Sequence, residues 1–205
     1  RPAVEFAAHN QKVARLEEMS VVTLKPFIRD AQPDDATAIG KALQAYLVQT
    51  EKEKTEQGAG GCLSPMGELP VKYRAEVEDP AGALSDCLVF VAELDRSVVG
   101  VVVVKPQAES VEVKRLWASP GVRGRGVGSA LLDVAIVAAG SVPVTLTVWD
   151  WRQSAIRMYE SRGFAQVVSW DERPRLICMR RDVRHAASRS AQARRRASHR
   201  VTTTH

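Results

Sequence analysis

Hydrophobic and polar residues follow two kinds of pattern along the chain, and together these patterns predict an α/β protein. Short runs rich in β-branched residues predict strands, and longer runs with apolar residues every three or four positions predict helices. The predicted strands are, in chain order, residues 21–28, 87–94, 98–105, 110–118, 142–148, 165–170 and 176–180. The predicted helices are residues 34–49, a short one at 70–77, 127–139 and 153–162.

Three connections have local signals of their own. The strands 87–94 and 98–105 are separated only by Asp95-Arg96-Ser97, which predicts an antiparallel hairpin. Gly140 directly follows the apolar run 127–139 and is a natural stop for that helix. Residues 50–67 are charged and then glycine-rich, which predicts a fraying helix end followed by a mobile loop.

Composition predicts one domain with two tails. The chain has 205 residues, of which 45% are hydrophobic, enough for a buried core. Residues 1–18 mix acids and bases and lack the apolar run of a secretory signal, so we expect a poorly ordered N-terminal extension. Residues 182–205 hold six arginines, one acid and little apolar bulk, and we expect them to be disordered. The predicted domain therefore spans residues 19–181.

The distribution of charge limits the classes of partner. The formal net charge of +5 equals the excess within residues 182–205, so the rest of the chain is balanced. This argues against a basic nucleic-acid-binding face on the domain; the tail is either an anchor for nucleic acid or a membrane surface, or a solvated end. No run approaches the roughly 18–20 apolar residues of a membrane span. We expect a cytoplasmic monomer or homodimer with no membrane partner and, for the domain, no nucleic-acid partner.

Cysteine and histidine usage excludes several kinds of site. The three cysteines are an odd number without a C-x-x-C pair, which predicts a reducing compartment and no structural zinc. All four histidines lie near the chain ends, outside residues 19–181: His9, His185, His199 and His205. This placement argues against a histidine-dependent catalytic triad and against a histidine-bound metal, so we expect no metal.

The most informative segment is residues 123–129, RGRGVGS, between a predicted strand and an apolar helix. Glycines let the backbone approach a ligand closely, and the helix start presents unpaired N–H groups, which together suit a phosphate. The spacing does not fit a Walker loop or a dinucleotide fingerprint, because Ser129 stands where the latter needs glycine. Taken alone, the segment is either a phosphate loop or a simple turn.

The same residues resemble the GNAT superfamily of acyl-CoA-dependent N-acetyltransferases. Its signature R/Q-x-x-G-x-G/A is matched by residues 123–128, and its Y-x-x-x-G-F signature by residues 159–164, with Ala155 four residues before the tyrosine. The order of predicted elements also fits over about residues 20–181. The resemblance implies a mixed, twisted sheet of about six or seven strands flanked by helices, splayed between strands 110–118 and 142–148 to form a wedge for coenzyme A.

The resemblance also implies which residues bind acetyl-CoA. The pyrophosphate would lie on the backbone amides of Arg123, Gly124, Arg125, Gly126, Val127, Gly128 and Ser129. The pantetheine arm would pair with the strand at Leu116, Trp117 and Ala118, as an added strand does. An amide at Leu116 or Ala118 would then stabilise the oxyanion formed during attack on the thioester.

The implied activity is transfer of acetyl from acetyl-CoA to a primary amine of a small molecule or peptide, by direct attack. A lysine-like amine has a pKa of about 10.4, so recovering its neutral form at pH 7 costs roughly 4.6 kcal/mol. A base is therefore useful, and Glu112 lies at the offset before Arg123 where some relatives carry one. On an extended strand Glu112 would share a face with Lys114 and Leu116. The alternative is that Glu112 faces solvent or pairs with Lys114.

Tyr159 is the candidate acid for the leaving thiolate, by its place in the second motif. The alternative is a core tyrosine that packs on Phe164. Tyr46 and Tyr73 are expected to lie away from the motif. A different class of function also stays open, a CoA-binding regulatory or interaction module without turnover.

Two features depart from the family pattern or leave the acceptor open. Arg152 occupies a position where many relatives have asparagine, next to Trp149-Asp150-Trp151; Asp150 either caps the next helix or orients an amine. The expected acceptor segment, residues 46–73, has a mild acidic excess. That excess, Glu51, Glu53, Glu56 and Glu68 against Lys52 and Lys54, is compatible with a cationic amine and equally with a solvated loop.

Overall fold

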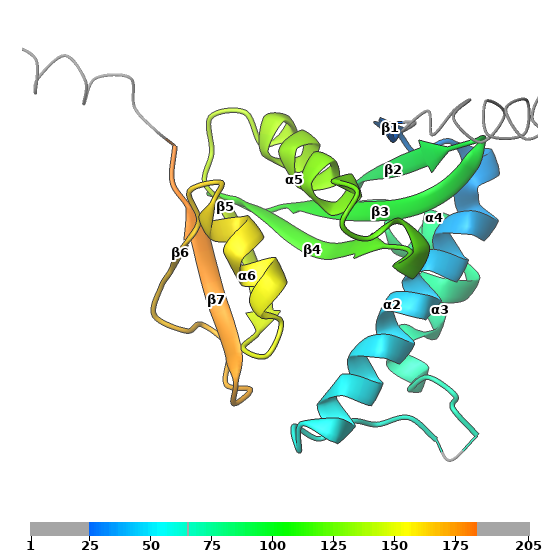
Figure 1. The fold of residues 1–205 in the computed structure, drawn as a ribbon, viewed down its shortest axis with the longest axis horizontal. Coiled ribbons are helices and arrows are strands. Elements are labelled where there is room, and N and C mark those ends of the chain that lie inside the picture. Colours follow the sequence, from blue (N-terminus) through cyan, green and yellow to red (C-terminus); the bar gives the residue numbers. More distant parts are fainter. Residues whose placement is uncertain (1–24, 65, 184–205) are drawn as a thin grey trace, which may run out of the picture.

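The computed structural model describes residues 25–64 and 66–183 (Figure 1). The predicted extension 1–18, residues 184–205 of the predicted tail and all four histidines lie outside the described residues. The domain boundaries at residues 19 and 181 therefore stay predictions. Within the described residues, no helix combines the length and the apolar character needed to cross a bilayer.

In the described part of the chain, seven strands form one mixed sheet in the order β1-β2-β3-β4-β5-β7-β6. The strands are β1 (Phe27–Asp30), β2 (Leu88–Leu94), β3 (Ser97–Pro106), β4 (Val111–Ala118), β5 (Val144–Trp149), β6 (Ala165–Gln166) and β7 (Leu176–Arg181). Every neighbouring pair is antiparallel except β4 and β5, which are parallel. This confirms the predicted mixed sheet, although β6 is much shorter than expected.

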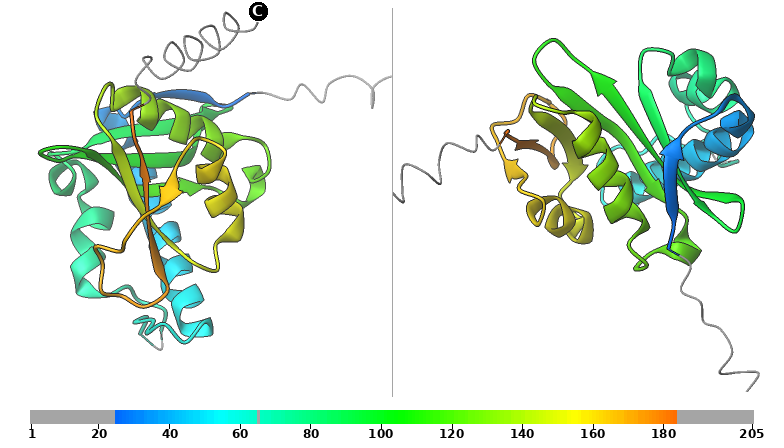
Figure 2. Two further views of the ribbon diagram at one scale, coloured as in Figure 1. Left: turned by 90° about the vertical axis from the view of Figure 1, so that its left-hand side faces the viewer. Right: turned by 90° about the horizontal axis from the view of Figure 1, so that it is seen from above.

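Helices cover both faces of this sheet (Figures 1 and 2). They are α2 (Ala36–Glu56), α3 (Arg74–Glu78), α4 (Pro80–Ala83), α5 (Val127–Ala138) and α6 (Gln153–Glu160), with short 3-10 turns η1 (Pro33–Asp35), η2 (Val71–Tyr73) and η3 (Pro120–Val122). Helices α5 and α6 pack on one face, and α2 packs on the other. Gly140 adopts a positive φ of 61° and its N–H closes the last turn of α5, as predicted for a helix stop.

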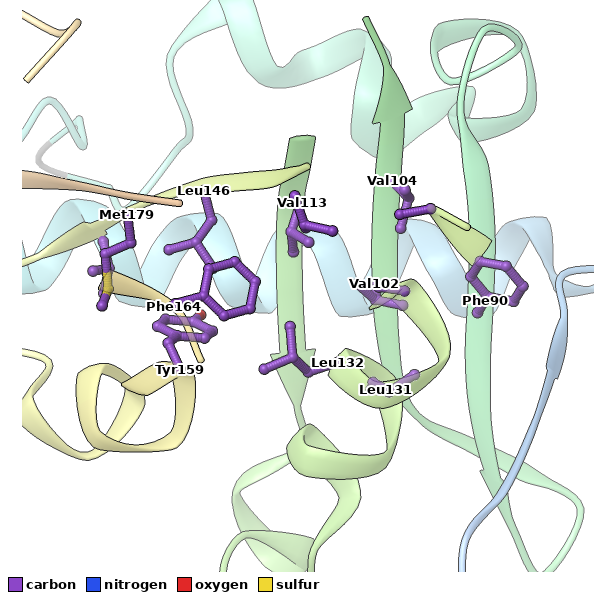
Figure 3. Packing of buried hydrophobic residues seen from close by; sticks show 14 of the residues in the cluster. Phe90, Val102, Val104, Val113, Leu131, Leu132, Leu146, Tyr159, Phe164 and Met179 are labelled. Atoms are coloured by element: carbon purple, nitrogen blue, oxygen red, sulfur yellow. The ribbon is translucent and has the colours of Figure 1, made fainter. Parts of the chain in front are cut away.

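Two apolar clusters hold these layers together, one on each face of β3. Val102 and Val104 pack with Leu131 and Leu132 on the α5 face (Figure 3). Val101 and Val103 pack with residues of α2 on the opposite face. All four valines are fully buried, which explains why β3 is apolar almost without interruption rather than alternating.

The sheet is splayed between β4 and β5. These two strands pair only from Val111 to Val113 and from Val144 to Leu146. Beyond that point β4 continues beside β3, and β5 continues beside β7. The two halves of the sheet therefore diverge into a wedge, at the place that the family resemblance implied.

A β-bulge in β4 changes which residues share a face. Val104 pairs with Val113 and Val103 pairs with Arg115, so Lys114 is an extra residue in the strand. The alternation of side chains is reset there, and Leu116 packs on the α5 face while Glu112 lies on the α2 face. The expectation that Glu112, Lys114 and Leu116 share one face is therefore wrong.

Helix α2 is longer than predicted. It continues to Glu56, through a charged stretch that was expected to fray into a loop. Thr50, Glu51 and Lys54 are buried in it, and Lys54 Nζ donates to both carboxylate oxygens of Glu51 at 2.9 and 3.0 Å. Contacts with later parts of the chain thus make a polar sequence helical.

Candidate active site

A cleft of about 470 Å³ fills the wedge between β4 and β5. Residues 116–118 of β4 and residues 147–148 of β5 line its two sides. The turn before α5 lines one end, and Tyr159 of α6 borders it as well. The cleft thus brings together both sequence motifs.

The turn before α5 depends on two glycines in the left-handed region. Gly124 has φ 75° and Gly126 has φ 81°, and Gly126 is the residue before the first helical residue of α5. The amides of Arg123 and Arg125 donate to the carbonyls of Pro120 and Val122, at 3.2 and 3.3 Å. The other five amides of the predicted phosphate site have no acceptor among the described residues: Gly124, Gly126, Val127, Gly128 and Ser129.

These five amides can hold an anion. They lie at the start of α5, where the helix dipole places partial positive charge, and no side chain caps this end. The residues that carry them line the cleft, whereas Arg125 is exposed and does not. The predicted site of seven amides is thus reduced to five, because two close the turn itself.

The side chain of Arg123 reaches from this turn across the cleft. Its Nε donates to the Ala118 carbonyl at 3.1 Å, and its terminal nitrogen donates to Gln49 Oε1 of α2 at 2.7 Å. Its guanidinium lies over the Trp117 ring, 4.5 Å from the centroid. Arg123 therefore links the turn to β4 and α2.

The open edge of β4 offers backbone groups to the cleft. The Ser119 N–H donates to the Val99 carbonyl of the neighbouring strand at 2.8 Å. Because successive residues of a strand direct their backbone groups to opposite sides, Trp117 also faces β3, and Leu116 and Ala118 face the wedge. Of the three predicted β4 residues, Leu116 and Ala118 can pair with an added strand, and Trp117 contributes its side chain.

Tyr159 is a core tyrosine that also borders the cleft, and its role as the acid stays a prediction. Its ring is only 7% exposed and packs on Phe164, with centroids 5.9 Å apart (Figure 3). It nevertheless lines the cleft, and no protein group of the described residues accepts a hydrogen bond from its hydroxyl. Burial raises the pKa of Tyr159 well above its ordinary value, and nearby Arg152 opposes part of that rise.

Tyr46 also lies at this site, and the expectation that it lies away from the motif is wrong. Its ring meets Trp117 edge-on at 6.3 Å, and the guanidinium of Arg152 lies 5.5 Å from its centroid. Helix α2 carries it to the wedge from a distant part of the sequence. In the sequence, the only indication that Tyr46 lies at the site was its position at the start of residues 46–73, the expected acceptor segment.

Glu112 lies outside the cleft. It lines a second cavity of about 500 Å³ on the α2 face, and its Oε2 accepts from Gln107 Nε2 at 3.0 Å. Lys114 pairs with Glu76 at 3.1 Å, so the alternative pairing of Glu112 with Lys114 is wrong. Four residues of strand, about 13 Å, separate Glu112 from Leu116.

The two cavities meet at the wedge. They share residues of both diverging strands and of the elements beside them: Tyr46, Lys114, Thr147, Val148 and Arg152. A molecule in the second cavity can therefore contact a molecule in the cleft. Tyr73 lies in the wall of the second cavity and not in the cleft.

Residues 149–152, which precede α6, make several contacts where the two cavities meet. Arg152 donates from Nε to Glu53 Oε2 at 2.7 Å and from Nη2 to Thr50 Oγ1 at 2.8 Å, and both acceptors lie on α2. Asp150 accepts from Arg175 Nε at 3.1 Å and does not cap α6, so the interpretation of Asp150 as a helix cap is wrong. Trp149 and Trp151 stack with centroids 4.8 Å apart.

The three cysteine thiols differ in their exposure. Cys62 is exposed, Cys87 is half-buried, Cys178 is buried, and all three are free. Burial raises the pKa of the Cys87 thiol to about 11. Within residues 25–64 and 66–183, no group of three or more His, Cys, Asp or Glu side chains is arranged to hold a metal ion.

Comparison with protein families gives one match, over the part of the chain that contains both motifs. Residues 85–166 match the model of the acetyltransferase (GNAT) domain, over a segment that includes the glycine turn, Tyr159 and Phe164. Over these residues the chain is similar to GNAT acetyltransferases, and this similarity supports acetyl transfer from acetyl-CoA as its general activity.

Solved structures share this fold at low sequence identity. A histone acetyltransferase HPA2 and related acetyltransferase from Corynebacterium glutamicum is 18% identical, with a TM-score of 0.57 over 79% of this chain and 98% of that one. A PaiA N-acetyltransferase from Thermoplasma acidophilum, solved in complex with coenzyme A, is 19% identical, with a TM-score of 0.55 over 78% and 99%. A ribosomal-protein-alanine N-acetyltransferase from Brucella melitensis is 20% identical, with a TM-score of 0.54 over 77% and 99%. No curated protein sequence gave a match.

Proposed function

We propose that this enzyme transfers acetyl from acetyl-CoA to a primary amine of a small molecule or peptide, by direct attack on the thioester. The observation that carries this proposal is the arrangement of the cleft. It has an anion-binding turn at one end, open strand backbone along one side and the Tyr159 hydroxyl on its border, and a second cavity opens into it.

The chain's own groups fit the cosubstrate. The five free amides from Gly124 to Ser129 would hold the pyrophosphate, with the positive end of α5 behind them. The wedge-facing N–H and C=O groups of Leu116 and Ala118 would pair with the amides of the pantetheine arm. The Ala118 carbonyl now accepts from Arg123, so that side chain would turn toward the phosphates when the arm binds.

Attack by the amine on the thioester carbon produces a tetrahedral intermediate with a negative oxygen. The N–H of Leu116 or Ala118 would donate to that oxygen and stabilise its charge. The bond from carbon to sulfur then breaks, and the electron pair leaves with the thiolate. Backbone donors suit this role because they are fixed before the reaction begins.

Tyr159 would donate to the departing sulfur. Its raised pKa keeps the hydroxyl protonated throughout the working range of pH, so a hydrogen-bond donor is always present. The nitrogen must lose a proton as it attacks, and Glu112 would receive that proton. About 13 Å of strand lies between Glu112 and Leu116, so the transfer would run through water in the second cavity.

Calorimetry with acetyl-CoA and amine-dependent thiol release test this proposal together. We expect binding of acetyl-CoA and release of free CoA thiol only when an acceptor amine is present. Binding without release for any amine would favour the alternative, a CoA-binding regulatory or interaction module. Absence of binding would contradict both. A cytoplasmic location and a monomeric or homodimeric state stay predictions from the sequence.

A further inference from the structure

The second cavity is strongly charged. Seven lysine and arginine side chains line it, against only two carboxylates, Glu51 and Glu112. The cationic side chains come from α2, η2, β3, β4, Arg152 and the segment before β7, so they surround the cavity. Whether this excess is available to a ligand depends on which cations already have a partner.

Four of the seven cations have a carboxylate of their own. The pairs are Lys54–Glu51, Arg152–Glu53, Lys105–Asp86 and Arg173–Asp171, with separations between 2.7 and 3.1 Å. These four are neutralised within the protein. Their side chains form part of the cavity wall, but their charge is already balanced by a carboxylate of the protein.

Of the other three cations, Arg115 and Lys114 share one carboxylate and Lys72 has none among the described residues. Arg115 donates to both oxygens of Glu76 at 3.1 Å, and Lys114 Nζ lies 3.1 Å from one of the same oxygens. The bulge in β4 places these two side chains on the same face. Lys72 lies over the Tyr73 ring, 4.9 Å from its centroid, and forms no ion pair with any described residue. These three cations face a single carboxylate, which Arg115 already holds in a bidentate pair, so a ligand can bind to Lys72 and to Lys114, which only shares its carboxylate.

The carboxylates of the cavity offer little to a positively charged ligand. Glu51 is 1% exposed and accepts hydrogen bonds from Lys54, from the Tyr73 hydroxyl at 3.1 Å and from the Cys62 N–H at 2.8 Å. Glu112 is the only lining carboxylate without a cationic partner, and it is the proposed proton acceptor. Of the acidic residues in 46–73, Glu51 and Glu53 are held in ion pairs, whereas Glu56 and Glu68 are exposed and do not line the cavity. The expected preference for a cationic amine therefore loses its basis.

We infer that the acceptor is an amine that also carries an anionic group, a carboxylate or a phosphate. This inference rests on the proposed function. The anionic group binds between Lys72 and Lys114, and the amine points to the junction with the cleft, where Lys114, Thr147 and Arg152 line both cavities. The same positive charges lower the pKa of a bound ammonium, which increases the fraction of neutral nucleophile.

Matched pairs of amines test the inference. We would compare L-amino acids with their carboxamides, and phosphoethanolamine with ethanolamine, and include spermidine as a cationic amine. Thiol release from acetyl-CoA is measured, with each kcat/KM corrected for the neutral fraction of the amine. Loss of a hydrogen bond to a charged group reduces binding roughly tenfold or more, so we expect the anionic member of a pair to lead by at least that factor. The two pairs separate a carboxylate from a phosphate ligand.

Variants place the effect in the cavity. Lys72→Gln and Lys114→Gln should each lower kcat/KM for the anionic acceptor roughly tenfold and leave the KM of acetyl-CoA unchanged. Lys52→Gln is the control, because Lys52 is exposed on α2 and does not line the cavity. The preference for the anionic member should also shrink as ionic strength rises.

The outcomes separate this inference from the proposed function. Faster transfer to ethanolamine, the carboxamides or spermidine would overturn the inference and leave the proposed function intact. Binding of the same pairs to the CoA-loaded protein gives a second readout that does not need turnover, and equal affinity within each pair would also overturn it. If acetyl-CoA does not bind, the proposed function fails and the inference fails with it.

Discussion

Arg152 donates from Nε to Glu53 Oε2 at 2.7 Å and thereby joins the start of α6 to α2, on the far side of the wedge. Both side chains are about four-fifths buried. Glu53 also accepts from Trp151 Nε1 at 3.1 Å and from Gln49, which in turn accepts from Arg123. One run of polar contacts therefore connects both halves of the splayed sheet through α2.

A double-mutant cycle measures this connection. We expect Arg152→Ala and Glu53→Ala to be coupled by about 1–3 kcal/mol in the free energy of unfolding, because the pair is shielded from water. The control is the exposed pair Arg74 and Glu78, whose coupling should be about 0.5 kcal/mol or less. Equal coupling energies in the two cycles would show that the Arg152 contact adds nothing special.

Tyr159→Phe should lower turnover by about 10- to 10³-fold, because the departing sulfur loses its hydrogen-bond donor. The KM of acetyl-CoA should change little, since the ring still packs on Phe164. Tyr46→Phe is the comparison, because Tyr46 is the other tyrosine that lines the cleft. A large loss in Tyr46→Phe with none in Tyr159→Phe would assign the donor to Tyr46 instead.

The pH profile checks the same role. Because the pKa of Tyr159 is raised, its hydroxyl keeps its proton as the pH increases. The rate should therefore rise as the acceptor amine loses its proton and then reach a plateau, without an alkaline fall up to about pH 10. A fall between pH 8 and 10 that disappears in Tyr159→Phe would contradict the raised pKa.

Gly126→Ala should weaken acetyl-CoA binding. An alanine at φ 81° is strained by about 1–2 kcal/mol, and relief of that strain moves the amides at the start of α5. We expect the Kd of acetyl-CoA, measured by calorimetry, to rise roughly tenfold. Gly121→Ala is the control, because Gly121 lies in the adjacent turn η3, has open space around its Cα and does not line the cleft. Equal affinity in the two variants would remove the turn from the binding site.

Glu51→Gln should destabilise the protein by about 3–5 kcal/mol, because Lys54 would remain buried without its carboxylate. Chemical denaturation measures the change, and Glu56→Gln, at an exposed position of the same helix, is the control. A loss no larger than that of the control would show that Lys54 finds another partner or solvent.

Acid titration shows whether ionised Glu51 stabilises or destabilises the folded protein. Burial alone would raise the pKa of Glu51, but hydrogen bonds from Lys54 and Cys62 outweigh it and the pKa is lowered. A lowered pKa contributes stability above the unfolded value of about 4.3, and this stability is lost as the pH falls toward the folded pKa. Wild-type stability should therefore decline below about pH 4.5 more steeply than that of Glu51→Gln. Parallel declines would contradict the lowered pKa.

The sequence was sufficient where a short segment determines its own structure. Gly140 ends α5, and Asp95 and Arg96 take the positive φ values of a tight hairpin turn. The glycines at 124 and 126 likewise reveal the turn before α5, since few other residues tolerate its conformation.

The sequence was insufficient where burial depends on distant partners. Residues 50–56 are charged and were expected to fray, yet Glu51 is held by Tyr73 and by the Cys62 amide, both far along the chain. The bulge at Lys114 leaves no mark in the local pattern of β4, so the side chains after it were expected on the wrong face. Both errors affected the acceptor cavity, whose charge could be judged only after its ion pairs were known.

The short contact between β4 and β5 has a consequence for ligand-linked stability. β4 and β5 pair over only three residues each, and beyond these residues both strands lack a neighbouring strand, within the described part of the chain, on the side that faces the wedge. An acyl carrier that pairs with Leu116 and Ala118 supplies those missing partners, so occupancy should tighten the angle between the halves. Amide hydrogen exchange in β4 should therefore become slower when the acyl carrier binds.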